Sequence, residues 1–570
     1  MKTIKRLMTL LLAASLVGCG SSSASGTDSG ASASGSTSNS STSDVSAATG
    51  QVADETRTAA EEPVDKVVVA VNSTATDVSP FGTISASRTF IQQALYAPLF
   101  YIKGGEFLDS VKPYIGKTIT KTDDYTYDIE IFDNIVDSKG NPIKADDVIW
   151  SYEKSAELYN FSPYLTNVES LTASDDTHLT MKLNTKVPGT IETLVCDSRL
   201  SIVSKDWYEG ASDDEIMNDP ATSGPYTVKS VISGSEVVMT ARKDYWKTNK
   251  DDMNPSEYRN VNDIVLKVIT EEAMRSISME TGEIDYASIG VTNLHRFYDN
   301  GKATDGYNVW IGSTTPTFAC VYMNMDEKSD SLFAKNENLR KAALYAIDSE
   351  ALMIAKGYNS DTGRVLKGFG NTKTGGYQES WNNEDYFDYN PEKAREFLKE
   401  AGYEPGEVEI TVMTTMMQPD TIRSVLIANL EDAGFKVNNF AVEQALYMKY
   451  AKESDQWDMC YGTKGFYNHV VPVWDANFNP AGYTNGSVCF THDDTLTDLL
   501  FAAEEDPSVE NLNAFNNYLK DHAIIKALFE GDGIEVCQDG ILKMEIGMFG
   551  FDPSASVYAS DYVSSPGAAN

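Results

Sequence analysis

Apolar residues recur along the chain with the spacing of strands in its first half. The unbroken apolar run in Lys66–Val71 is typical of a strand buried on both faces of a parallel sheet. Tyr125–Ile131 instead alternates apolar and polar positions, and Leu179–Leu183 repeats that alternation, as half-buried antiparallel strands do. The pattern therefore predicts sheet from the first of these runs to about Cys196.

The second half of the chain changes to helical spacing. One predicted helix places five apolar residues on a single face: Leu339, Ala342, Ala343, Ala346 and Ile347. A second has Asn390 as its N-cap, Pro391 at its first position and Gly402 at its end. A third, with apolar residues from Ile422 to Ala433, ends at Gly434 before the short apolar segment 435–437. Helices alternating with short strands predict βαβ units and a second α/β lobe.

The N-terminus has the pattern of an exported and lipid-anchored chain. Basic residues precede the apolar stretch Leu7–Val17, which is too short to span a bilayer but suits a signal peptide. Leu16–Cys19 resembles a bacterial lipobox, in which cleavage before Cys19 leaves a thiol that accepts diacylglycerol. Ser, Gly, Ala and Thr then dominate up to about Pro63. We therefore expect a signal peptide over 1–18, then a lipidated cysteine and flexible linker over 19–63, with the body held at the extracytoplasmic face of the cell membrane.

Composition and charge narrow the class of protein. The 570 residues are 41% hydrophobic and 23% charged, which supports a packed body of more than one domain. The formal net charge is -38. Nucleic acid and anionic lipid are poor partners for such a surface, which keeps an exposed protein soluble and favours cationic ligands only weakly.

The cysteines predict neither a disulfide framework nor a metal centre. Beyond Cys19 an odd number is scattered over the chain, so at least one thiol is unpaired and buried structural thiols are expected: Cys196, Cys320, Cys460, Cys489 and Cys537. Cys489 and His492 have ligand-like spacing, but no second pair accompanies them. No metal site and no cofactor are therefore predicted.

Several segments together carry a family resemblance. Tyr125–Tyr152 combines the strand TYDIEIF with a turn at 137–142 and a helix start at 144–148, where Asp146 and Asp147 suit a helix N-terminus. Four further segments follow in order: Ser223–Trp246, Gly282–Asp285, Asn338–Asp348 and Tyr389–Gly402. In order and spacing the chain from Asp65 to Phe551 resembles the oligopeptide- and dipeptide-binding family of ABC-importer solute-binding proteins, family 5.

The resemblance implies a fold and a function. The fold is an α/β, two-lobed periplasmic-binding-protein-like fold, type II, in the large variant with an extra subdomain in lobe one. Lobe one is expected over 64–288 with 525–570, its inserted subdomain over about 100–196, and lobe two over 289–524. Such a protein is a monomer that closes on a peptide or peptide-like ligand and delivers it to ABC transporter permease subunits. A metal complex or haem as cargo stays open, because relatives carry such ligands.

The resemblance also implies two ligand-binding segments. The first is the loop Thr83, Ile84, Ser85, Ala86 and Ser87, expected to pair with the ligand backbone before a helix at 91–95, unless it is an ordinary strand-to-helix connection. Arg88 next to it either meets a ligand carboxylate or is a solvated or structural arginine. The second segment supplies the remaining candidates: Tyr461, Thr463, Lys464, Phe466, Tyr467, Asn468 and Trp474.

The second segment departs from the family pattern. The family shows a tryptophan and then an aspartate that receives a peptide's free α-amine, and both are missing from Cys460–Asn468. A buried ammonium needs a paired charge, so recognition of a free N-terminus is in doubt. Lys464 either meets an anionic or blocked ligand or is an exposed lysine, and the aromatic residues either wall the cleft or belong to the core.

An enzyme from another class is the alternative function. Ser151-x-x-Lys154, Tyr298-Asp299-Asn300 and Lys373-Thr374-Gly375 occur in the order used by penicillin-interactive serine enzymes. The nucleophilic serine of that class begins its helix, whereas Ser151 lies inside a helix expected to start near Asp146. Ligand binding without catalysis is therefore the prediction, and the identity of the ligand and of the permease stays undetermined.

Overall fold

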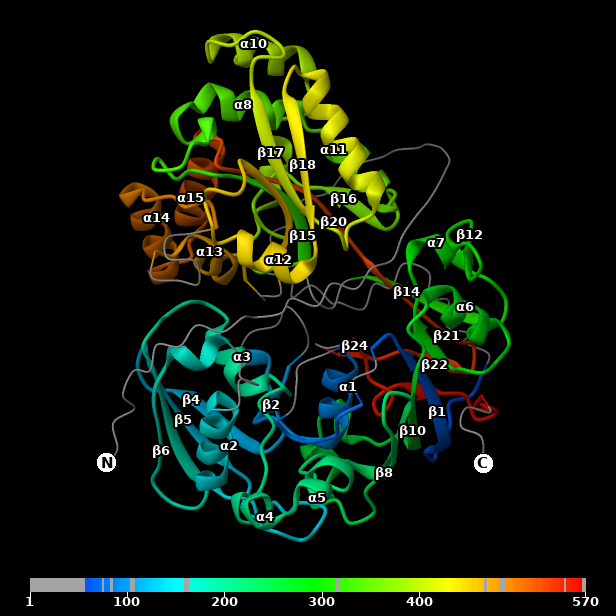
Figure 1. Ribbon diagram of the computed structural model, residues 1–570. Coiled ribbons are helices and arrows are strands. Elements are labelled where there is room, and N and C mark those ends of the chain that lie inside the picture. The colour runs from blue at the N-terminus through cyan, green and yellow to red at the C-terminus, as the bar shows by residue number, and fades with distance from the viewer. Residues whose placement is uncertain are drawn as a thin grey trace, which may run out of the picture.

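Two bodies make up the computed structural model, which describes residues 57–73, 76–81, 86–102, 108–157, 163–312, 317–465, 469–480, 488–547 and 550–565. They form the lower and upper parts of Figure 1, and each has its own central sheet packed against helices. The predicted two-lobed α/β fold is thus confirmed. Among the described residues, no helix combines the length and the apolar character needed to cross a membrane. The predicted signal peptide, Cys19 and the linker up to residue 56 lie outside the described residues.

The first lobe is organised around a seven-stranded mixed sheet. Strand β1 pairs in parallel with β10 and β11, and the sheet continues antiparallel on both sides. Val67 and Val69 enter the core on one face while Val68 enters the core on the other, which confirms a strand buried on both faces. The strands, in spatial order, are β14 (Tyr307–Gly312), β21 (Gly533–Gln538), β11 (Tyr286–Ser288), β1 (Val64–Val71), β10 (Val261–Val268), β9 (Glu236–Ala241) and β8 (Tyr226–Ile232).

Helices cover both faces of this sheet. Ile91 and Leu95 of α1 pack on the face that holds Val67, and Met279 of α6 packs on the opposite face. The helices of this lobe are α1 (Ala86–Leu95), α4 (Lys205–Gly210), α5 (Asp213–Asn218), α6 (Glu272–Glu280) and α7 (Val291–Leu294). Short ribbons complete it: β12 (Tyr298–Asp299) with β13 (Lys302–Ala303), β22 (Ile541–Lys543) with β25 (Val557–Tyr558), and β23 (Ile546–Gly547) with β24 (Gly550–Phe551).

A smaller antiparallel sheet stands beside the first lobe, within the range predicted for an inserted subdomain. Its strands are β4 (Gly116–Lys121), β5 (Thr126–Ile131), β7 (His178–Leu183) and β6 (Val168–Ala173). The antiparallel pairing of β5 with β7 confirms the alternation predicted there. The other elements are β2 (Phe100–Tyr101), β3 (Lys112–Pro113), α2 (Ala145–Glu157) and α3 (Thr190–Cys196). Lys144, which precedes the first residue of α2, has no hydroxyl group to cap the helix. The Asp147 carboxylate, in the first turn, instead accepts a hydrogen bond from the Lys144 backbone N–H at 2.8 Å.

The second lobe has a six-stranded sheet with helices on both faces. Its strands, in spatial order, are β16 (Gly363–Val365), β20 (Ile525–Gly531), β15 (Thr317–Met323), β19 (Met459–Gly465), β17 (Glu409–Thr415) and β18 (Lys436–Val442). Alternate residues of β15 supply the two cores: Phe318, Cys320 and Tyr322 enter one, and Val321 enters the other. Helices α12 (Gln444–Tyr450), α13 (Val470–Phe478), α14 (Asp494–Glu505) and α15 (Val509–Asp521) cover the first of these faces.

The predicted helices of the second half cover the other face. They are α8 (Glu337–Ala346), α9 (Ser349–Lys356), α10 (Pro391–Glu400) and α11 (Asp420–Asp432). The Asn390 side chain accepts the Lys393 backbone N–H at 2.9 Å, and Gly402 has a φ of 92°, so both predicted ends of α10 are confirmed. Strand β18 follows α11 and pairs in parallel with β17, which is the predicted βαβ unit.

The chain passes between the lobes at two places whose positions differ from the prediction. Strand β14 still belongs to the first sheet, so the first crossing lies between Gly312 and Thr317 and not at 288–289. Strand β20 belongs to the second sheet and β21 to the first, so the return crossing lies at 531–533 and not at 524–525. The lobe boundaries differ from the predicted ones because long-range strand pairing assigns each strand to a sheet, and the local spacing of apolar residues does not encode that pairing.

Candidate functional site

The junction between the lobes has a tightly packed backbone. Gly531 ends β20 where an added Cβ would overlap the Tyr358 ring, and Gly312 ends β14 where one would overlap the Trp310 ring. Only glycine fits at these two positions without displacing an aromatic side chain. The crossings therefore hold their strands at defined positions beside ring systems of both lobes.

Charged groups tie neighbouring loops to the return crossing. Glu530 is 4% exposed and accepts hydrogen bonds from the Thr372 backbone N–H and the Arg364 Nε, each at 2.8 Å. Asp532, in the crossing itself, forms an ion pair with Lys373. Burial raises the pKa of Glu535, further along in β21, to about 7. The junction thus combines paired charges with a buried carboxyl group.

One edge of the second sheet gathers the carboxyl ends of parallel strands. Strands β17, β18 and β19 run parallel to one another, so their carboxyl ends face the same side of the sheet. In open α/β sheets ligands bind beyond such ends. The last residues of β19 pair with the first residues of β15, Lys464 with Phe318 and Gly465 with Thr317, directly after the first crossing. The carboxyl end of β19 therefore lies at the lobe junction.

Part of the predicted first segment falls outside the described residues. This holds for Thr83, Ile84 and Ser85 and for the side chains of Ala86, Ser87 and Arg88. The backbone of the last three is the start of α1, so the helix begins at Ala86 and not near Ile91. Alanine is the strongest helix former, which favours a helix that already begins at Ala86 although polar residues follow it.

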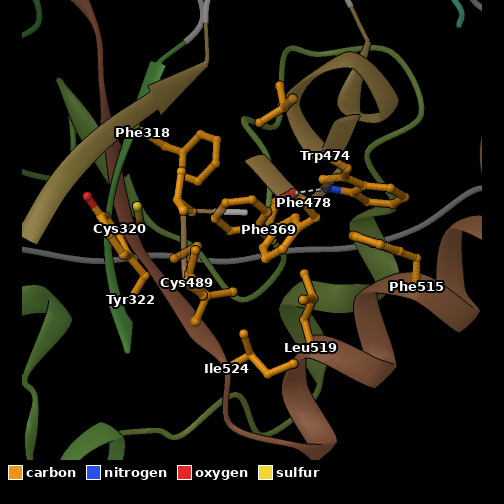
Figure 2. Packing of buried hydrophobic residues seen from close by; sticks show 14 of the residues in the cluster. Phe318, Cys320, Tyr322, Phe369, Trp474, Phe478, Cys489, Phe515, Leu519 and Ile524 are labelled. Atoms are coloured by element: carbon orange, nitrogen blue, oxygen red, sulfur yellow. Dashed lines mark hydrogen bonds between the residues drawn. The ribbon is translucent and has the colours of Figure 1, made fainter. Parts of the chain in front are cut away.

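The predicted second segment divides between core and junction. Thr463 and Lys464 are half-buried in the last part of β19, and Phe466, Tyr467 and Asn468 lie outside the described residues. Tyr461 is 1% exposed and belongs to one core of the second lobe. Trp474 is fully buried in the other, as Figure 2 shows, where its indole N–H donates to the Phe369 carbonyl at 2.7 Å. The structure thus places these two aromatic residues inside the second lobe and not along its surface.

The residues of the enzyme alternative are not assembled into one site. Ser151 lies within α2, fully buried, and its hydroxyl bonds the backbone of Val203. Lys154 pairs with Glu157 on the same helix at 3.1 Å. Lys373 belongs to the other lobe and is paired with Asp532. The serine therefore has neither the exposure nor the neighbours that a nucleophile needs.

The thiols behave as structural groups. All five cysteines beyond Cys19 are buried and none forms a disulfide, which confirms the expectation of buried structural thiols. Burial raises the pKa of Cys320 to about 12 and of Cys460 to about 11, so both stay protonated near neutral pH. Among the residues that the structure describes, no group of three or more His, Cys, Asp and Glu side chains could hold a metal ion.

One contact between the lobes, away from the crossings, has no counterpart in the sequence interpretation. Val187, between β7 and α3, is 7% exposed, and every other buried member of the cluster that it joins comes from the second lobe. The neighbouring Lys186 Nζ lies 2.7 Å from the Glu505 carboxylate at the end of α14 and 3.2 Å from Asp124. Lys186 and Glu505 are 319 positions apart, so no local pattern could have indicated their contact. We call Lys186 and Val187 the subdomain latch.

Known proteins share the sequence and the fold. The family model described as bacterial extracellular solute-binding proteins, family 5 middle, matches residues 111–485. Heme-binding protein A of Haemophilus influenzae is 23% identical over 354 residues, which are 56% of this chain and 59% of that protein. Di/tripeptide-binding protein 3 of Pseudomonas aeruginosa is 24% identical over 352 residues, which are 56% of this chain and 60% of that protein. The chain thus spans less than two thirds of the length of the curated relatives that it matches.

The fold has solved counterparts. The ABC transporter substrate-binding protein CtaP of Listeria monocytogenes superposes with a TM-score of 0.72 at 18% identity, over 88% of this chain and 100% of that one. Such low identity shows the shared fold alone. The family model covers more than half of the chain, and the predicted resemblance is therefore confirmed: the chain belongs to the family 5 bacterial extracellular solute-binding proteins.

Proposed function

We propose that this protein captures peptides or peptide-like ligands between its two lobes and delivers them to the permease subunits of an ABC importer. The observation that carries the proposal is the construction of the molecule, in which separately cored sheets are joined by strands that cross at 312–317 and 531–533. Membership of family 5 supports it, as does a relative whose name is di/tripeptide-binding protein. The family is one of binding proteins and not of enzymes.

Ligand capture follows from a shift between open and closed arrangements of the lobes. Rigid lobes joined by short crossings move by a hinge, which concentrates backbone changes in a few residues. A ligand favours closure only to the extent that it contacts both lobes and binds the closed arrangement more tightly. The latch contributes contacts to the closed arrangement in addition to those of the ligand.

The ligand-binding residues are proposed on both sides of the junction. The first lobe contributes Thr83–Arg88, at and before the start of α1. The second lobe contributes Thr463, Lys464 and the segment 466–468. Beyond Cys460, β19 pairs with β15 but, within the described chain, no longer with β17. The edge of a strand accepts an extended peptide through main-chain hydrogen bonds, which suits a peptide ligand.

Attachment to the membrane rests on the N-terminal sequence. We propose that Cys19 is lipidated and that the segment up to about residue 63 is a tether, so that the protein works as a monomer at the extracytoplasmic face. Globomycin treatment of cells that express the full chain should block signal cleavage and leave a heavier precursor. Normal processing of a Cys19→Ala variant would contradict lipidation.

Mass spectrometry of small molecules released on denaturation tests the proposed function. Protein purified from its natural producer or from rich medium should release peptides or peptide-like compounds in near-stoichiometric amounts. Small-angle scattering before and after their removal should show a more extended particle without ligand. A particle with the same dimensions in both states, and no peptide in the released fraction, would refute capture of peptides between the lobes.

A further inference from the structure

The ammonium of Lys464 is held in an unusual place for a lysine. It lies on the face of the second sheet that also holds Phe318, Cys320 and Tyr322, and its Nζ is 4.8 Å from the centre of the Tyr322 ring. The residue is half-buried. It also lies close enough to the Cys320 thiol to oppose the rise in pKa that burial causes there. The cation is thus partly withdrawn from water and surrounded by aromatic and sulfur groups.

No anion of the described chain balances this charge. Other lysines of the junction and latch are paired, Lys373 with Asp532 and Lys186 with Glu505. Lys464 forms no ion pair with a carboxylate among the described residues. The residues that follow Gly465 in sequence, Phe466, Tyr467 and Asn468, include no acidic side chain. The chain carries 84 acidic and 46 basic residues, yet none of the described carboxylates pairs with this ammonium.

The position of Lys464 connects this charge to the ligand. Its backbone pairs with Phe318, one residue into β15 from the point where the chain arrives from the first lobe. It also stands one residue before the end of β19, on the edge where parallel strands present their carboxyl ends. A partly desolvated ammonium is stabilised strongly by an anion that reaches it, because few water molecules hydrate the ammonium and the surrounding dielectric constant is low.

From these contacts we infer that Lys464 binds an anionic group of the ligand, so that the protein selects peptide-like ligands that carry a carboxylate. The inference rests on the proposed function and names the ligand class of that site. Selection acts through the charge of the ligand and not through its sequence. The ammonium is a point charge, so it can pair with a carboxylate in many orientations. A ligand with an amide in place of the carboxylate leaves the cation unbalanced and binds more weakly.

Two matched peptide libraries test the inference. N-acetylated random tetrapeptides are prepared with a free C-terminal carboxylate or with a C-terminal amide, all side chains being uncharged. Each library is incubated with ligand-free protein, and retained peptides are quantified by mass spectrometry after rapid gel filtration. Wild-type protein should retain the acid library at least tenfold better than the amide library.

Variants separate Lys464 from other lysines. Lys464→Met should lose the preference for the acid library, and Lys464→Arg should keep most of it. Lys449→Met is the control, because Lys449 also lies over a tyrosine ring, Tyr450 at 5.0 Å, but is exposed and has Glu453 within 3.7 Å. Thermal unfolding of each variant checks that it folds.

Each outcome decides a different claim. Equal retention of both libraries by the wild type, or a preference that persists in Lys464→Met, overturns the inference and leaves peptide capture intact. If Lys449→Met also loses the preference for the acid library, the inference is overturned, because the positive charge of the protein then acts at long range and not through contact with Lys464. Retention of neither library refutes peptide capture, and the inference fails with it.

Discussion

We expect the subdomain latch to make a measurable contribution to lobe closure. Separating the lobes exposes Val187, which is now 7% exposed, because its cluster partners belong to the second lobe. Val187→Ala removes two methylene equivalents, each worth about 0.8 kcal/mol when buried, so closure should weaken by about 1.6 kcal/mol. Since 1.4 kcal/mol is a factor of ten, the ratio of open to closed molecules should rise by about tenfold or slightly more.

The ion pair of the latch should matter less than its apolar residue. The Lys186 side chain is 22% exposed and that of Glu505 is 66% exposed, so water and salt screen the pair. Pairs of this kind contribute roughly 0 to 1 kcal/mol. Lys186→Met should therefore change the closure equilibrium at most about fivefold, and less at high salt.

Distances between spin labels can report the closure equilibrium. Ser174→Cys in the subdomain and Asp498→Cys on α14 place labels on the two sides of the latch, and both positions are exposed. The native cysteines that the structure describes are buried, so they should resist labelling. Pulsed electron paramagnetic resonance of the ligand-free protein should show a larger population at long distances in Val187→Ala than in the parent.

A matched substitution guards against a general loss of stability. Val168→Ala alters a half-buried valine that packs against the core of the subdomain itself and not against the second lobe. It should leave the distance distribution unchanged. If Val187→Ala and Val168→Ala both gave the parent distribution, the latch would not contribute to closure and the energetic reasoning would be wrong.

Three further predictions concern pH, a buried lysine and the ligand. Burial raises the pKa of Glu535 to about 7, so the folded state binds a proton that the unfolded state has released, and the free energy of unfolding should fall as pH rises from about 4.5 through 7. Thermal unfolding between pH 5 and 8 should show this slope reduced in Glu535→Gln but kept in Glu510→Gln, an exposed residue, and an unchanged slope in Glu535→Gln would contradict it. The Lys526 ammonium donates to three backbone carbonyls at 3.1, 2.8 and 2.7 Å, so Lys526→Met should lower the free energy of unfolding by about 3 kcal/mol in urea titrations. Lys399→Met, at an exposed position of α10, should have little effect. Calorimetric titration with a mixed library of free-amine tripeptides should show no tight binding, because the carboxylate that receives an α-amine in the family is missing, and tight binding regardless of sequence would show this expectation to be wrong.

Local features of the fold were accessible from the sequence because they depend on neighbours along the chain. The N-cap at Asn390 and the end of α10 near Gly402 follow from side-chain and backbone preferences within a few residues. The alternation in β5 and the apolar run in β1 follow from which faces of a strand are buried. The start of α1 at Ala86 differs from the prediction because the helix preference of alanine competes there with that of the polar residues that follow.

The sequence by itself determined the type of the helices and strands predicted above, the absence of a disulfide framework and the order of segments that indicates the family. Only the tertiary structure decided which strands belong to which lobe, that Tyr461 and Trp474 are core residues, and that Val187 bridges the lobes. The physical reason is that pairing and burial join residues hundreds of positions apart, as Lys186 and Glu505 are. Spacing along the chain records which faces are apolar, but not which other apolar surface each face meets.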